Sequence, residues 1–203
     1  MIALLSASPL TAQDESVGIR AFAAIDSDTL TAQKSFDAVL GTSRLTTFGG
    51  GADVLNVWKA AFVRLAVSHT TKSGSRAFVV NGQVVSLNIP IKVSMTPMEI
   101  GGGWRFVSSR SARIVPYTGG GVLIQPYSEK STFAAPGDDV SQINTGFTAF
   151  GGVEIDVSKW LMVGGEAQFR GVPNALCKGS VSQDFGETNL GGFALRVLFG
   201  IRR

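Results

Sequence analysis

Large apolar residues alternate one by one with small or charged residues along most of the chain. The last segment shows this most clearly, because the odd positions Phe193, Leu195, Val197, Phe199 and Ile201 alternate with Ala194, Arg196, Leu198, Gly200 and Arg202. Successive side chains of a β-strand point to opposite faces, so a period of two predicts a strand with one large apolar face and one small or charged face.

Eight segments follow this pattern, over residues 17–25, 45–57, 61–69, 98–106, 114–128, 147–155, 161–170 and 193–202. The connections between them alternate in length. Short connections lie at 58–60, 108–113 and 157–159, and long ones at about 27–44, 72–90, 130–142 and 171–187. Inside the second long connection, Asn81-Gly82 between two apolar runs (76–80 and 84–87) predicts a small hairpin, since this dipeptide favours a two-residue turn.

An up-and-down antiparallel meander places all four long connections at one end. Even strand number, strands of about ten residues, short turns at one end and long loops at the other are typical of transmembrane barrels. The predicted fold is therefore all-β: an eight-stranded antiparallel up-and-down transmembrane β-barrel with short periplasmic turns and long extracellular loops.

The charged residues of these strands fall on the same face as many of the glycines. An eight-stranded lumen is narrow and is filled by side chains, and a charge inside it needs a partner. We therefore expect a lumen plugged by ion pairs; a charged pore is the alternative. The predicted network consists of Arg20, Asp53, Arg64, Glu99, Arg105, Glu154, Glu166, Arg170 and Arg196. Asp28 is assigned to the first long loop.

The opposite, apolar face carries large aromatic groups near the strand ends. Membrane barrels have aromatic girdles at both lipid–water interfaces, so these side chains are predicted to lie there. They are Trp104, Phe106, Trp160, Phe169, Phe193 and Phe199. A soluble, lipocalin-like barrel would instead turn this face inward and the charges to water.

Composition agrees with this pattern. Hydrophobic residues make up 44% of the chain, charged residues only 16%, and 25 of the 203 residues are glycine. The longest stretches without a charge, 77–91 and 114–128, are shorter than the roughly 20 residues that a membrane-spanning helix needs. The glycine triplets at 49–51, 101–103 and 119–121 lack the Lys-Ser/Thr of a phosphate loop, and we interpret them as tight barrel wall.

Three stretches resemble the small outer-membrane β-barrel superfamily, which includes the OmpA- and OmpX-type eight-stranded proteins: 116–122 (PYTGGGV), 150–154 (FGGVE) and 191–201. The resemblance covers about residues 15–203. It implies integral location in the outer membrane of a Gram-negative envelope. The implied partners are outer-membrane lipid, the barrel-assembly machinery during insertion, and an extracellular or envelope partner bound through the loops. Such chains usually end on an aromatic residue, whereas this one ends FGIRR.

Residues 1–13 are uncharged, apolar and then small, which is typical of the later part of a secretory signal peptide, so the barrel domain is assigned to 14–203.

The net charge of +3 comes with no basic cluster, and no nucleic-acid partner is expected. Cys177 and His69 are the only residues of their kinds, which leaves no intramolecular disulfide and no metal cluster. No catalytic residue, metal or cofactor is predicted.

The preferred function is therefore a non-enzymatic outer-membrane protein with a structural or surface-interaction role. A small passive channel or carrier of apolar solutes is the second hypothesis. A lipid-modifying enzyme using His69 and a soluble lipocalin-like binder are further alternatives. His69 and Ser68 cannot form a dyad, because neighbours on a strand point to opposite faces.

Overall fold

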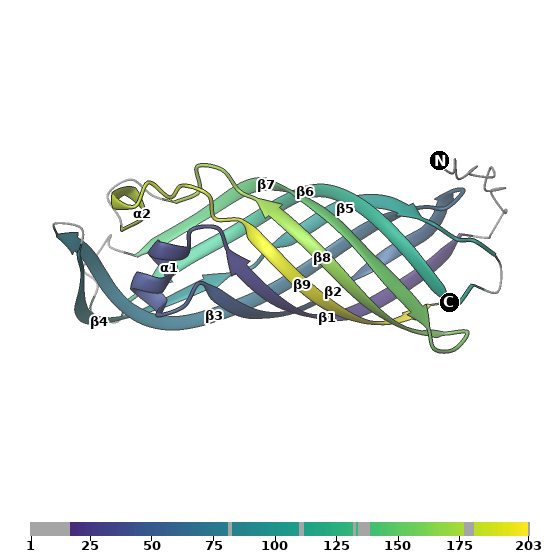
Figure 1. Ribbon diagram of the computed structural model, residues 1–203, viewed down its shortest axis with the longest axis horizontal. Helices are drawn as coiled ribbons and strands as arrows, with labels where there is room; N and C mark the ends of the chain where they lie inside the picture. Colours follow the sequence, from purple (N-terminus) through teal and green to yellow (C-terminus); the bar gives the residue numbers. More distant parts are fainter. Residues whose placement is uncertain are drawn as a thin grey trace, which may run out of the picture.

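The computed structural model is a closed β-barrel whose strands are strongly tilted relative to its long axis, with two short helices at one end (Figure 1). It describes residues 17–80, 83–109, 112–131, 133, 139–176 and 181–202. The predicted signal segment 1–13, the turn residues Asn81 and Gly82, and Cys177 lie outside these ranges. The elements are β1 (Gly18–Leu30), α1 (Gln33–Leu40), β2 (Arg44–Trp58), β3 (Ala61–Val80), β4 (Gln83–Met95), β5 (Met98–Arg105), β6 (Ile114–Lys130), β7 (Val140–Asp156), β8 (Leu161–Gly171), α2 (Val181–Asp184) and β9 (Gly192–Arg202).

The sheet closes because β1 pairs antiparallel with both β2 and β9, the last strand. Strands β4 and β5 lie end to end between the same neighbours, β3 and β6, so the ring has eight positions although nine strands form it. The predicted up-and-down barrel is confirmed. The fourth position is divided at Thr96-Pro97, where proline has no N–H to donate to the ladder. The Pro97 carbonyl still accepts a hydrogen bond from the Ser68 amide.

The second long loop was predicted wrongly. Residues 72–80 and 83–90 are not a loop with a separate hairpin; they are the outer halves of β3 and β4, which run on beyond their neighbours and project from one end of the barrel (Figure 1). The paired ends predicted for the hairpin are present, with Phe78 opposite Val85 and Val80 opposite Gln83. A register shift between Ser75 and Ala77 marks the place where the projecting part begins.

The first long loop is also shorter than predicted, because β1 continues to Leu30 and helix α1 follows it. Phe36 and Leu40 are buried on one face of this helix. The helix ends at Gly41, whose φ of 71° is the left-handed conformation that glycine favours at a helix C-terminus. Helix α1 packs against β3 at Gly74, where a Cβ atom would collide with the Val39 carbonyl oxygen.

Side chains along each strand alternate between the lumen, where most of them are buried, and an outer wall that is apolar. In β1, for example, Arg20, Phe22 and Asp26 are buried, whereas Ile19 and Ile25 are exposed. The lumen has two different fillings. The half nearer the short turns holds charges and aromatic rings, and the half nearer the helices holds the upper core, a cluster of Leu30, Ala32, Phe36, Leu40, Leu45, Val93, Met95, Leu123, Tyr127, Val172, Ala175 and Leu190.

The outer wall is a belt of exposed aliphatic side chains that runs around the barrel. Leu65 and Leu195, for example, are 56% and 58% exposed. A soluble protein rarely leaves so large a continuous apolar surface in water, and a bilayer removes that cost. The lipocalin-like alternative is therefore wrong, because the charges lie inside and the apolar face lies outside. Within the residues that the structure describes, no helix is long and apolar enough to cross a membrane.

A charge placed on the aliphatic belt tests whether this surface faces the lipid. Leu65 lies on β3 between Ala52 and Ile100 of the neighbouring strands, at mid-height of the belt. We expect Leu65→Arg to lower the free energy of unfolding in lipid vesicles by about 2–4 kcal/mol, because it places a charge at the bilayer midplane. Urea unfolding followed by tryptophan fluorescence measures the difference.

Ser141→Arg is the matched control. Ser141 is exposed on the outer wall of β7 opposite Ser128, beyond the apolar belt, and its substitution should cost no more than about 1 kcal/mol. Equal losses in the two variants would contradict a lipid-facing belt at the height of Leu65.

Candidate functional site

The candidate site is the charged half of the lumen. Among the described residues, five arginines and six carboxylates are buried there, each no more than 7% exposed. They come from seven strands and occupy inward positions of the two-residue period. We call them the lumen network: Arg20, Asp26, Asp28, Asp53, Arg64, Glu99, Arg105, Glu154, Glu166, Arg170 and Arg196.

The end of the network nearest the short turns is built around Glu154 of β7. One of its oxygens accepts a hydrogen bond from Arg105 Nε at 2.9 Å, and the other accepts one from Arg20. Arg20 also donates through Nε to Asp53 of the neighbouring strand at 2.9 Å. Two guanidinium groups and two carboxylates therefore close this level of the lumen.

Arg64 of β3 connects this level to the next. Its Nε donates to Asp53 Oδ1 at 2.9 Å, and its Nη1 reaches across the lumen to Glu166 Oε2 of β8 at 2.5 Å. The Tyr117 hydroxyl donates to the same Glu166 oxygen at 2.9 Å. Arg64 thus shares both of its carboxylate partners, Asp53 with Arg20 and Glu166 with Tyr117.

Arg64 is also enclosed by four aromatic rings. Its guanidinium carbon lies 5.1 Å from the ring centre of Phe22, 5.5 Å from Phe62, 5.6 Å from Tyr117 and 4.7 Å from Phe150. A cation near the face of an aromatic ring is attracted by its quadrupole, more strongly where water is excluded. We call these four residues the ring cluster.

The ring cluster explains several of the glycines. A Cβ atom at Gly51 would lie 2.7 Å from Phe22 Cζ, and one at Gly103 would lie 2.8 Å from Phe62 Cζ. A Cβ atom at Gly119 would lie 2.6 Å from Phe150 Cζ. At the same positions a Cβ atom would lie still closer, at 2.2–2.4 Å, to a carbonyl oxygen of a neighbouring strand. These inward-facing glycines are therefore required both by the rings and by the close approach of the strands.

The part of the network nearest the upper core contains Arg196 and Arg170. Arg196 Nε donates to Asp26 Oδ1 at 2.8 Å, and its terminal nitrogens contact Glu99 at 3.2 Å and Glu166 at 3.3 Å. Arg170 bonds Asp28 at 2.8 Å and Asp26 at 3.0 Å. These contacts complete one unbroken series across the lumen: Arg105, Glu154, Arg20, Asp53, Arg64, Glu166, Arg196, Asp26, Arg170 and Asp28.

All nine charged residues that the alternation placed on the inner face lie in this network. Two members, Asp26 and Asp28, were not predicted to face the lumen, and the assignment of Asp28 to a loop was wrong. Both lie on β1. Asp28 accepts a hydrogen bond from the Thr47 hydroxyl at 2.5 Å and also forms an ion pair with Arg170. Continuing the period of the strand at 17–25 by five residues would have placed both carboxylates on the face of Arg20.

The six predicted girdle residues lie on the outer wall. Phe169 and Phe193 are opposite each other near the helices, where Phe147 joins them with its ring 6.0 Å from that of Phe169. Trp104, Phe106, Trp160 and Phe199 lie towards the short turns, and Trp104 is only half-exposed because the Trp58 ring packs edge-on against it at 5.8 Å. Sequence reasoning did not include Phe147 and Trp58, although both continue the outward pattern.

His69 also lies on the outer wall, opposite Phe48. Its Nδ1 is 2.9 Å from the Thr96 hydroxyl and its Nε2 is 3.0 Å from the Thr71 hydroxyl. Both ring nitrogens are therefore engaged by threonines on the surface of the barrel, well away from the lumen network.

Several solved outer-membrane barrels have this architecture. The attachment invasion locus protein Ail of Yersinia pestis, solved with the heparin analogue sucrose octasulfate, matches with a TM-score of 0.52 at 10% identity, over 93% of this chain and all of that one. The N-terminal barrel of Pseudomonas aeruginosa OprF matches with 0.51 at 11% identity, over 92% and 97% of the chains. A major outer membrane protein of Thermus thermophilus matches with 0.55 at 11% identity, over 93% and 100%.

These likenesses confirm the fold of the small outer-membrane barrels. The sequence matches no protein-family model and no curated protein.

The position of Arg64 generates a stability test of the network. We expect Arg64→Met to lower the free energy of unfolding by about 3–5 kcal/mol, because it leaves Asp53 and Glu166 buried without their shared cation. Urea unfolding of the protein refolded in lipid vesicles measures the loss.

The matched control is Arg113→Met, since Arg113 is exposed between β5 and β6. It should change the free energy of unfolding by no more than about 0.5 kcal/mol. A loss as small as this in Arg64→Met would show that the network does not stabilise the barrel.

Proposed function

We propose that the chain works in the outer membrane as a non-enzymatic barrel with a closed lumen and that it acts through its extracellular end. The lumen network is the observation that carries this proposal. Its side chains reach across the interior from opposite strands, for example from β3 to β8 through Arg64 and Glu166, so the space a channel would need is filled. To pass, an ion would have to separate buried ion pairs, at a cost of several kcal/mol for each buried charge that loses its partner.

The closed lumen predicts the electrical behaviour of the protein. In planar bilayers the refolded chain should give no steady conductance at moderate voltage, because the network and the upper core both block the interior. Single-channel recording tests this, with a refolded porin as the positive control for insertion.

Steady steps of porin size would overturn the closed-lumen proposal. If Glu154→Gln also changed the size of such steps, the passive-channel hypothesis would replace it. A carrier of apolar solutes is disfavoured by the same geometry, because Arg20, Arg64 and Glu154 line the route such a solute would take.

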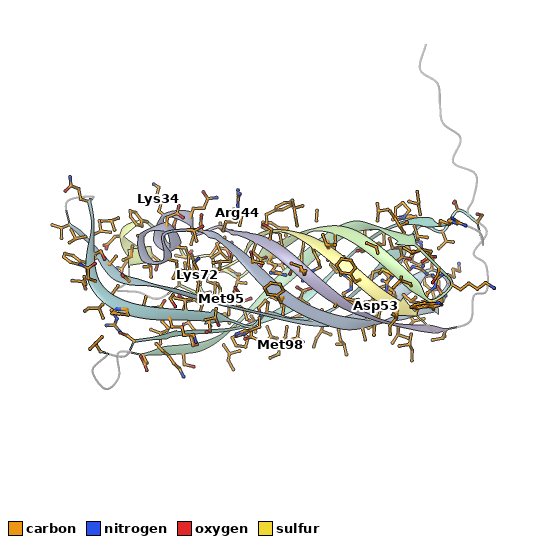
Figure 2. All side chains as sticks on the ribbon, turned by 90° about the horizontal axis from the view of Figure 1, so that it is seen from below. Lys34, Arg44, Asp53, Lys72, Met95 and Met98 are labelled. Carbon is orange, nitrogen blue, oxygen red and sulfur yellow. The ribbon has the colours of Figure 1, made fainter. Side chains whose placement is uncertain are left out.

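The extracellular end offers the features expected of a surface-interaction protein. Helices α1 and α2 and the projecting β3–β4 hairpin gather at this end (Figure 1). Figure 2 shows Lys34, Arg44 and Lys72 towards the same end, while Asp53 lies in the opposite half. The hairpin exposes Phe78, Val84 and Leu87 beyond the barrel wall. Function on a rigid scaffold commonly resides in such connecting segments.

The orientation has its own test, in a Cys177→Ser background. Val85→Cys, near the hairpin tip, should react with a membrane-impermeant maleimide on intact cells, since β-barrels of this type carry their long connections outside. Gel detection of the label measures the reaction.

Lys59→Cys is the matched control, because Lys59 occupies the short turn between β2 and β3 at the other end. It should react only after the outer membrane is permeabilised. Labelling of Lys59→Cys but not Val85→Cys on intact cells would reverse the orientation and contradict the proposal.

The remaining partners follow from this placement. Outer-membrane lipid would contact the aliphatic belt, and the barrel-assembly machinery would insert the chain. An enzymatic role through His69 has little geometric support. In the described part of the chain, the His69 ring nitrogens bond the hydroxyl groups of Thr71 and Thr96. Neither threonine is the acid that would orient a catalytic histidine, and the His69 ring faces outward rather than into the lumen.

A further inference from the structure

A cavity of about 350 Å³ opens at the extracellular end, between α1, α2, the β3–β4 hairpin and the ends of β6 and β7. This volume lies within the range of small-molecule sites, which are mostly apolar with a few polar groups. Its walls fit that description, with Phe36 and Val39 from α1, Leu87 and Ile91 from β4, and Leu176 and Val181 from the last long connection.

The cavity is blind on its inner side. Val93 and Tyr127 line it and are 1% and 4% exposed, and both belong to the upper core. Leu123, which is fully buried, lies in the same core four residues further down β6. The upper core therefore separates the cavity from the lumen network, and a molecule that enters must leave by the same route. The cavity is therefore closed towards the lumen network and does not continue into a channel.

The polar groups of the walls are engaged by the protein itself. The Tyr127 hydroxyl donates to the Glu129 carboxylate, the Gln142 amide donates to the Ala175 carbonyl at 2.5 Å, and the Ser35 hydroxyl donates to Glu187 at 2.5 Å. The surface left for a ligand is therefore mixed: apolar side chains make up somewhat more than half of it, and polar groups that already have protein partners make up the rest.

The charges of the walls also balance. One guanidinium, Arg76, and one carboxylate, Glu129, line the cavity. A charged ligand would lose its hydration without meeting a net opposite charge, whereas a neutral one would bury hydrocarbon at little electrostatic cost.

We propose that this cavity binds a small neutral amphiphile, a molecule that is mostly hydrocarbon with one hydroxyl or ester group, at the extracellular side. The site is independent of the closed lumen, so its failure would leave the conductance prediction unchanged.

The experiment uses the full chain in lipid nanodiscs with isoleucine δ1-methyl groups labelled with carbon-13. Titration with 1-decanol should shift the Ile91 methyl resonance saturably, whereas partition into the lipid alone would shift belt residues such as Ile100 linearly. Decanoate and decyltrimethylammonium, the anionic and cationic analogues, should bind at least about tenfold more weakly.

Two filling variants locate the site. Val39→Trp on α1 and Ala77→Phe on the hairpin should each weaken decanol binding about tenfold or more, because each places a ring where the ligand would lie. Ile143→Trp is the control, since Ile143 is 74% exposed on β7 and does not line the cavity. Because Ala77 lies on a projecting hairpin, its variant keeps the test valid if Val39→Trp fails to fold, which the heat-induced shift in gel mobility reports.

Three results would overturn the proposal. They are no saturable shift of Ile91 with decanol, equal or tighter binding of either charged analogue, and unchanged affinity in a filling variant that folds.

Discussion

The pairing of buried guanidinium groups with carboxylates is the constraint on which the rest of this barrel depends. The outer wall must be apolar to meet lipid, so the charges of the strands can only point inward, where each needs a partner. Because an arginine reaches far, its partners lie on strands that are distant in sequence. Arg20 joins β1 to β7, Arg64 joins β3 to β8, and Arg196 joins β9 to β5. The pairs therefore brace the cylinder across its diameter, while backbone hydrogen bonds hold it around its circumference.

This bracing also sets the shape of the wall. The ring cluster surrounds Arg64, and three of its rings lie beside a glycine on the neighbouring strand. Phe22 is paired with Gly51, Phe62 with Gly103 and Phe150 with Gly119. The many glycines and the few charged residues of the sequence thus have a common origin. A narrow lumen that holds long charged side chains and aromatic rings must be lined with the smallest residue elsewhere.

The sequence predicted what repeats every two residues and missed what does not. The alternation in 193–202 or 161–170 was enough to assign inside and outside, and closure and strand order followed from the alternating lengths of the connections. The register shift beyond Ser75 and the break at Thr96-Pro97 interrupt the period, so the prediction of a loop at the outer halves of β3 and β4 was wrong.

Helix α1 was missed although Phe36 and Leu40 have helical spacing and Gly41 marks its end, because the conformation of eight residues between strands is decided by packing rather than by local propensity. The cavity could not be predicted at all, since its walls come from six helices and strands that are separate in the sequence.

One strand relates the two sites to the membrane. The inward face of β6 carries Tyr117, which bonds Glu166 of the lumen network, Leu123 in the upper core and Tyr127 at the cavity. The ten residues from Tyr117 to Tyr127 span about 33 Å along the strand, which a tilt of roughly 40° reduces to about 25 Å along the barrel axis, the height of an apolar belt. The outward neighbours agree, because Val122 is exposed in the aliphatic belt while Ser128, beside Tyr127, faces Ser141 beyond it. The network therefore lies at the depth of the lipid, where a closed lumen preserves the barrier, and the cavity lies above it, where a ligand can enter from water.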